Sequence, residues 1–224
     1  MGDASWGALW LVDVVSGTGS RLSILACGCR PRARLGIILS EAYSDGPWED
    51  SVVPDIVMVI APKVFRDEEY SEPKRVFESR GATVVTASVT PGECIGKLGM
   101  RALAEISVAD AASRDWDAVV FVGGAGASVY FDDPAGHELA RRAAAGTGVL
   151  AAICIAPSTL ARAGLLSGVR ATAFASQKDD LVAHGATWTG ESVTTDGHIV
   201  TGNGPEAATE FGEAIGDLLG LPRD

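Results

Sequence analysis

The sequence predicts an α/β domain in which a mostly parallel sheet is covered by helices on both faces. From Asp55 onward, short apolar runs rich in β-branched residues alternate with amphipathic segments. Two of these runs, 119–122 and 149–153, are apolar at every position, as expected of parallel strands buried on both faces. Several amphipathic segments end at a glycine, which commonly terminates a helix.

The chain has 224 residues, which suits one large domain with a substantial hydrophobic core. Residues 1–52 are interrupted by glycine- and proline-containing stretches and show no consistent periodicity. We interpret residues 1–52 as an N-terminal extension of unknown role. Residues 53–224 are expected to form the α/β domain.

The expected elements follow one another as strand, loop and helix units. The first unit is a βαβ crossover whose helix stops at Gly81. The expected strands cover 56–61, 83–87, 118–122, 149–153 and 170–174, and 193–195 with 198–201 form a hairpin. The expected helices cover 69–80, 134–145, 157–163 and 205–219.

Composition narrows the possible partners and the cellular compartment. A net charge of -11 would repel nucleic acid and anionic membranes. No apolar run approaches the roughly 18 residues that span a bilayer, and the N-terminus lacks the basic region of a signal peptide. The four cysteines, at positions 27, 29, 94 and 154, form neither a disulfide framework nor zinc knuckles. We therefore expect a cytoplasmic protein without a metal, a cofactor, a nucleic-acid partner or a membrane partner.

Cys154 is the residue most suited to chemistry. It follows an apolar strand directly and precedes Pro157, which favours the first turn of a helix. In open α/β sheets, ligands bind beyond the carboxyl ends of the strands. Backbone N–H groups and the helix N-terminus are expected to lower the pKa of a thiol at this position. The alternative is that Cys154 is a small buried hydrophobic residue.

Two further features lie at the same edge of the expected sheet. Gly123 and Gly124 follow a buried strand, where glycine lets backbone N–H groups approach a ligand or an oxyanion, although a tight loop explains them equally. Glu68 and Glu69 begin the first helix, where an acidic residue is favoured by the helix dipole. A desolvated carboxyl there could also remain protonated and donate a hydrogen bond to a thiolate.

Together these features resemble the ThiJ/PfpI superfamily, which is related to class I glutamine amidotransferases and includes deglycases, glyoxalases and intracellular peptidase-like proteins. The resemblance rests on residues 152–157, on 119–124, and on Glu69 followed by Pro73 and Gly81. It implies a flavodoxin-like three-layer sandwich and a homodimer. It also implies that Cys154 is the reactive cysteine, that Glu69 is its carboxyl partner, and that the N–H groups of Gly124 and Ile155, with Gly123 beside them, form an oxyanion site.

The chain departs from the family pattern in its histidines. Many members have a histidine after the cysteine, where this chain has Ile155, which cannot transfer a proton. Another branch has a histidine at the end of the next strand, where this chain has Phe174. The remaining histidines, at positions 137, 184 and 198, are expected to be structural or surface residues.

The sequence therefore predicts a cysteine-dependent enzyme acting on a small carbonyl compound, of the glyoxalase or deglycase type or a related hydrolase or hydratase. Thiolate addition to an α-oxoaldehyde requires only Cys154, Glu69 and an oxyanion site. Peptide hydrolysis is less favoured, because an amine leaving group requires a general acid. Two alternatives remain: a redox-stress sensor or chaperone-like protein in which Cys154 is oxidised, and a non-catalytic binding protein.

Overall fold

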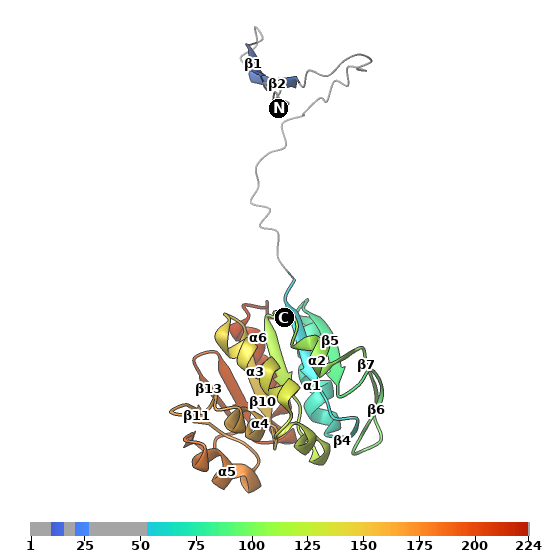
Figure 1. The fold of residues 1–224 in the computed structure, drawn as a ribbon, viewed down its shortest axis with the longest axis vertical. Coiled ribbons are helices and arrows are strands. Elements are labelled where there is room, and N and C mark those ends of the chain that lie inside the picture. The colour runs from blue at the N-terminus through green and yellow to red at the C-terminus, as the bar shows by residue number, and fades with distance from the viewer. Residues whose placement is uncertain (1–9, 16–20, 27–52, 224) are drawn as a thin grey trace, which may run out of the picture. The chain divides into compact units, whose positions relative to one another are not determined.

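The computed structural model describes residues 10–15, 21–26 and 53–223 of the chain (Figure 1). The chain divides into two compact units, Met1–Glu49 and Asp50–Asp224, and each is described by itself. In the first unit, β1 (Trp10–Val15) pairs with β2 (Arg21–Ala26) in an antiparallel hairpin. No strand is predicted here from the sequence, because glycines and prolines interrupt the apolar runs. Cys27 and Cys29 lie outside the described residues.

Within residues 53–223, a seven-stranded sheet runs through the centre of the second unit, in the order β13-β14-β10-β9-β3-β5-β8. All neighbouring pairs are parallel except β13 and β14, which form a hairpin. The strands are β3 (Asp55–Val59), β5 (Thr83–Ser88), β8 (Ile106–Ser107), β9 (Ala118–Phe121), β10 (Val149–Ile153), β13 (Val193–Asp196) and β14 (Ile199–Gly202).

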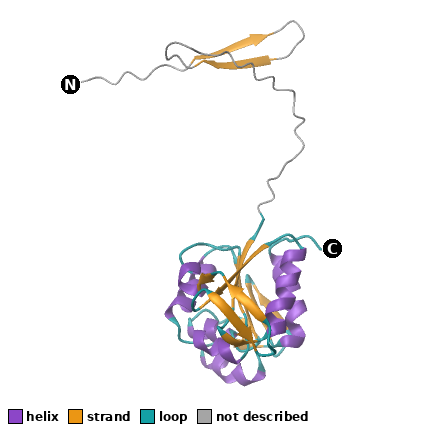
Figure 2. Ribbon diagram, turned by 90° about the vertical axis from the view of Figure 1, so that its right-hand side faces the viewer, coloured by secondary structure: helices purple, strands orange, loops and turns teal. Residues whose placement is uncertain are grey.

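Helices cover both faces of this sheet (Figure 2). On one face, α1 (Asp67–Ser79) packs against α6 (Ala208–Leu218). The other face is covered by α2 (Val108–Ala111), α3 (Pro134–Ala145) and α4 (Pro157–Arg162), with α5 (Lys178–Ala183) packed against α4. The predicted flavodoxin-like three-layer sandwich is confirmed.

The core lies where the central strands are covered on both faces. Every residue of β9 and β10 is buried, as are four of the five residues of β3. Strands in this position cannot alternate between apolar and polar side chains, because both of their faces contact helices. This explains the continuous apolar runs from which the sheet is predicted.

A small three-stranded sheet beside the main one is not predicted from the sequence. It consists of β4 (Lys63–Phe65), β6 (Gly92–Gly96) and β7 (Arg101–Ala104), and β4 pairs with β6 across an irregular register. Asp67 joins this sheet to α1, because its buried carboxylate accepts hydrogen bonds of 2.8 Å from the N–H groups of Leu98 and Met100. β6 both begins and ends at a glycine, and all three strands are short, so they lack a clear strand signal.

Two predicted elements differ from the structure in detail. The strand expected over 170–174 is only β11 (Arg170–Ala171), which pairs with β12 (Thr187–Trp188) outside the main sheet. The backbone leaves strand geometry there because the N–H of Thr172 donates to the Thr201 hydroxyl and the N–H of Phe174 donates to the Cys154 carbonyl. The last helix begins with a 3₁₀ turn, Pro205–Ala207, before α6. No helix in the described part of the chain is long and apolar enough to cross a membrane.

Candidate active site

Cys154 lies at a sharp turn between β10 and α4. Its φ angle is 63°, a left-handed conformation that is unfavourable for residues other than glycine by about 1–2 kcal/mol. Two hydrogen bonds hold it there. The Cys154 N–H donates to the Gly202 carbonyl at 2.9 Å, and the Phe174 N–H donates to the Cys154 carbonyl at 2.8 Å. The strained turn directs the side chain beyond the carboxyl ends of the strands, and 8% of the surface of Cys154 is exposed.

Glu69 reaches the same point from the first turn of α1. Its side chain is fully buried, and its Oε2 accepts a hydrogen bond of 3.1 Å from the Gly123 N–H. Its Oε1 is buried without a hydrogen-bond partner. Neighbouring Glu68 instead pairs with Arg66, through contacts of 2.8 and 3.2 Å. Of the two acidic residues considered in the sequence, only Glu69 faces the cysteine.

Gly123 allows the carboxyl and the cysteine to come together. A Cβ atom at this position would lie 2.5 Å from both Cys154 Cβ and Glu69 Oε2, so any side chain would separate them. Because the Gly123 N–H is bonded to Glu69, it is not free to bind an oxyanion. In this structure the Gly123 N–H therefore positions the carboxyl.

The N–H groups of Gly124 and Ile155 lie close enough to the sulfur of Cys154 to lower its pKa. Gly124 has a φ angle of 90°, and a Cβ atom there would collide with the backbone of Val64, Phe65 and Arg66. The Arg66 N–H also donates to the Gly123 carbonyl at 3.0 Å. The loop that follows β9 is thus pressed against the start of α1, and this contact fixes the direction of the Gly124 N–H.

The ionisation of the pair differs from the expectation. Burial raises the pKa of Glu69 to about 7, although Cys154, Arg66 and the Gly123 N–H act in the opposite direction. Burial, followed by the negative charge of Glu69, raises the pKa of Cys154 to about 12. The N–H groups of Gly124 and Ile155 lower it without compensating. The predicted fall in the cysteine pKa is therefore wrong, since burial and the charge of Glu69 outweigh these two backbone donors.

The hydrogen bonds of the three histidines lead to residues other than Cys154. His137 Nε2 is bonded to the Phe131 carbonyl, and His184 Nδ1 to the Asp180 carbonyl, each at 2.8 Å. His198 lies at the opposite sheet edge, where its carbonyl accepts the Leu150 N–H at 3.0 Å. Ile155 packs against the core. In the ranges that the structure describes, no cluster of three or more His, Cys, Asp or Glu residues could hold a metal ion.

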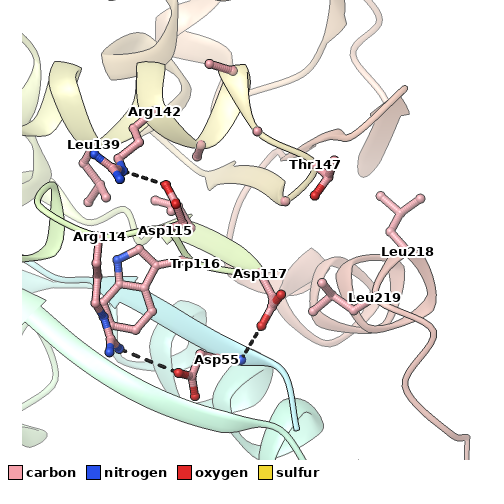
Figure 3. Close-up of a pocket in the computed structure, with 15 residues that line it drawn as sticks. Asp55, Arg114, Asp115, Trp116, Asp117, Leu139, Arg142, Thr147, Leu218 and Leu219 are labelled. Atoms are coloured by element: carbon pink, nitrogen blue, oxygen red, sulfur yellow. Dashed lines mark hydrogen bonds and ion pairs between the residues drawn. The ribbon is translucent and has the colours of Figure 1, made fainter. Parts of the chain in front are cut away.

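A pocket of about 710 Å³ lies away from Cys154, at the amino ends of β3, β9 and β10 (Figure 3). Its charged side chains pair with one another: Arg142 with Asp115 at 2.7 Å, and Arg114 with Asp55 at 3.9 Å. The ring of Trp116 is covered by the guanidinium of Arg114. Because this pocket contains no cysteine and each of its carboxylates is ion-paired or hydrogen-bonded, we place the candidate active site at Cys154.

Sequence reasoning missed two residues that shape this site. Asp67 anchors the β6–β7 hairpin to the start of α1, two residues before Glu69. Arg66 lies close enough for its charge to lower the pKa of Glu69. A signal for Asp67 is present in the sequence, since an acidic residue precedes Glu68 and Glu69, but the helix dipole accounts for all three equally.

The fold and the site together define a class of protein: an α/β sandwich with a cysteine on a strained strand-to-helix turn and a buried glutamate beside it. Residues 55–217 match the model of the DJ-1/PfpI family. The chain belongs to this family, as the resemblance in its sequence predicts.

Individual relatives agree with this assignment. An uncharacterised protein of Methanocaldococcus jannaschii is 40% identical over 160 residues, which cover 70% of this chain and 78% of the relative. Protein dj-1beta of Drosophila melanogaster is 32% identical, over 73% of this chain and 88% of its own.

Among solved structures, a ThiJ/PfpI domain protein from Brachyspira murdochii has a TM-score of 0.72 and 30% identity, over 76% of this chain and 99% of its own. The structure of Drosophila DJ-1beta has a TM-score of 0.69 and 28% identity, over 75% of this chain and 91% of its own.

Proposed function

We propose that this protein is a cysteine-dependent enzyme acting on small carbonyl compounds, in a reaction of the glyoxalase or deglycase type or a related hydration or hydrolysis. The observation that carries the proposal is the pairing of a strained Cys154 with the buried Glu69, whose Oε1 has no partner. Such a carboxyl can take a proton from the thiol and return it to a reacting atom.

The raised pKa of both groups indicates how the thiol is activated. At neutral pH Cys154 is a thiol, and Glu69, with a pKa of about 7, is divided between carboxyl and carboxylate. In the proposed first step, the Cys154 sulfur attacks the aldehyde carbon while its proton passes to the Glu69 carboxylate. The N–H groups of Gly124 and Ile155 stabilise the resulting alkoxide, which then takes the proton from Glu69 to give a hemithioacetal.

For methylglyoxal, the remaining steps balance without an external oxidant. Glu69 removes the proton from the former aldehyde carbon, and the electron pair forms an enediol. Protonation of the neighbouring carbon gives a thioester, so one carbon is oxidised and the next is reduced. Water then displaces the thiol, releasing lactate and restoring Cys154. The overall reaction is methylglyoxal plus water to lactate.

Cysteine peptidase activity is less well supported. Expulsion of an amine requires a proton donor at the leaving nitrogen, and the residue after the cysteine is Ile155. The side chains of His137 and His184 are bonded to backbone carbonyls.

A second candidate is a redox sensor, in which peroxide oxidises Cys154 to a sulfinic acid. Each of two peroxide molecules would transfer one oxygen to the sulfur and leave as water, and the free Oε1 of Glu69 could hydrogen-bond the product. A DJ-1 structure from Toxoplasma gondii, 25% identical, is of the oxidised protein. The raised pKa of Cys154 disfavours this role, because the thiolate is the form that reacts.

The exposed face of the small sheet supports a homodimer, in which this face is covered by a second copy of the chain. Leu103 on β7 is 67% exposed and Ile95 on β6 is 41% exposed, and Leu98 in the turn between these strands is 65% exposed. The acidic composition and the free thiols of Cys94 and Cys154 favour a cytoplasmic location without a nucleic-acid or membrane partner. Leu103→Glu should convert a dimer to a monomer in light scattering after gel filtration. A monomeric wild type would refute the dimer.

The enzyme proposal is tested by lactate formation from methylglyoxal. We expect turnover by the wild type, loss of turnover in Cys154→Ser and Glu69→Gln, and retention in Cys94→Ser, which removes the other described free thiol. No lactate above background with the wild type would refute the glyoxalase reaction. Peroxide treatment followed by mass spectrometry tests the sensor, which requires two oxygens at Cys154 before any other cysteine reacts.

A further inference from the structure

Phe174 is a large aromatic residue that remains 48% exposed at the end of the segment that follows β11. Its backbone is held beside that of the reactive cysteine, since its N–H donates to the Cys154 carbonyl at 2.8 Å. Isolated exposed apolar residues are common and need no explanation. Phe174 differs because its backbone is hydrogen-bonded directly to that of Cys154.

The ring lies on the β14 side of Cys154. β10, which leads into Cys154, stands between β9 and β14 in the sheet. The β9 side carries Gly123 and the Glu69 carboxyl. On the β14 side, Gly202 accepts the Cys154 N–H, and a Cβ atom at Gly204 would contact Phe174 Cδ2 at 3.7 Å. The Glu69 carboxyl and the Phe174 ring therefore lie on opposite sides of β10, the first towards β9 and the second towards β14.

The charge beside the ring is negative. A Cβ atom at Gly204 would also lie 3.8 Å from Glu206 Oε2, so the Glu206 carboxyl and the Phe174 ring both lie beside Gly204. A carboxylate or phosphate on the substrate would be repelled there, whereas an apolar group would bury its surface against the ring.

From these contacts we infer that Phe174 is a specificity-determining residue that selects carbonyl substrates with an uncharged apolar or aromatic substituent. The inference deepens the proposed function and rests on Cys154 being the nucleophile. A favourable contact between two aromatic rings corresponds to roughly a three- to tenfold preference. The same preference is expected for any thiol-directed reagent of suitable shape, whether or not the protein turns it over.

The first experiment measures the reactivity of Cys154 without catalysis. N-benzylmaleimide and N-methylmaleimide each add to a thiol so that the sulfur binds one alkene carbon and a proton binds the other. The ratio of their rates at Cys154, followed by peptide mass spectrometry, is compared with the ratio for N-acetylcysteine. We expect the protein to favour the benzyl reagent by a further three- to tenfold or so, and Phe174→Ala to return the ratio to that of the free thiol.

Val182→Ala provides the matched control, because Val182 is also an apolar side chain, 50% exposed, on the following helix α5. This variant should leave the ratio unchanged. Equal ratios in the wild type and Phe174→Ala would overturn the inference, as would a Cys154 that reacts with neither maleimide.

The second experiment compares kcat/KM for phenylglyoxal and methylglyoxal, measured as mandelate and lactate. The wild type should favour phenylglyoxal, and Phe174→Ala should lose that preference. If the wild type turns over neither compound but retains the maleimide preference, the proposed reaction is refuted and the role of Phe174 in binding apolar groups is supported. If it turns over both and Phe174→Ala leaves the ratio unchanged, the inference fails and the proposed reaction stands.

Discussion

Replacing Gly124 with alanine is expected to damage both the fold and the reactive site. Gly124 has a φ angle of 90°, and an added Cβ atom would lie 2.5 Å from the Val64 carbonyl oxygen and 2.6 Å from the Phe65 carbonyl carbon. These are backbone atoms, which cannot rotate away as a flexible side chain can. The loop after β9 would have to move from the start of α1, and the N–H that donates to the Cys154 sulfur would move with it.

The expected cost has two parts. A residue with a side chain in this left-handed region costs about 1–2 kcal/mol, and forcing an extra methyl group into a packed site costs about 1–3 kcal/mol. We therefore expect Gly124→Ala to lower the free energy of unfolding by about 2–5 kcal/mol. Gly164→Ala is a control that carries only the backbone cost. Gly164 has a similar φ angle of 83°, but no atom lies within 4 Å of an added Cβ.

The assay is urea denaturation of the wild type, Gly124→Ala and Gly164→Ala, together with the alkylation rate of Cys154 in native buffer. Gly164→Ala should lose about 1–2 kcal/mol from backbone conformation alone and keep the wild-type alkylation rate. Gly124→Ala should lose clearly more and change that rate. Equal losses of stability in the two variants would refute the proposed close packing of Gly124 against the backbone of residues 64–66.

Two further predictions follow from the site. Burial raises the pKa of Glu69 from 4.5 to about 7, so the folded state binds this proton more tightly than the unfolded state. The resulting stability is fully present below about pH 4.5 and is lost as the pH rises through about 7, by about 3 kcal/mol in all. Glu69→Gln should remove this dependence in denaturation curves at pH 5 and 8, and an unchanged slope would contradict the raised pKa. Phe174→His should place a proton carrier on the residue whose backbone N–H is bonded to the Cys154 carbonyl. It should raise kcat for methylglyoxal roughly tenfold or more; no increase would mean that the ring at 174 does not reach the reacting atoms.

The central sheet was predictable because burial on both faces leaves a strong pattern. The residues of β9 and β10 are all buried, and their sequences are apolar throughout. The small sheet was not predictable, because its strands are short and Val64 within β4 adopts a φ angle of 57°, which is unfavourable for a β-branched residue. The shortened strand at Arg170–Ala171 has the same origin, since bonds to Thr201 and Cys154 draw the backbone away.

At the site, the positions of the residues were predictable and their ionisation was not. Cys154, Glu69, Gly124 and Ile155 each stand at the carboxyl end of a strand or the start of a helix, and such ends meet at one edge of a parallel sheet. The sequence cannot show how deeply the pair is buried, and burial decides the direction of both pKa shifts. The engagement of the Gly123 N–H by Glu69 likewise depends on a contact between residues 54 positions apart.

The central claim is that Cys154 and Glu69 act as one proton-sharing pair. The most direct test is the pH dependence of Cys154 alkylation by iodoacetamide in the wild type and in Glu69→Gln. The negative charge of Glu69 helps to raise the pKa of Cys154, so its removal should shift the alkylation profile to lower pH while abolishing turnover of methylglyoxal. Coincident profiles for the two proteins, or a shift to higher pH in Glu69→Gln, would contradict the account.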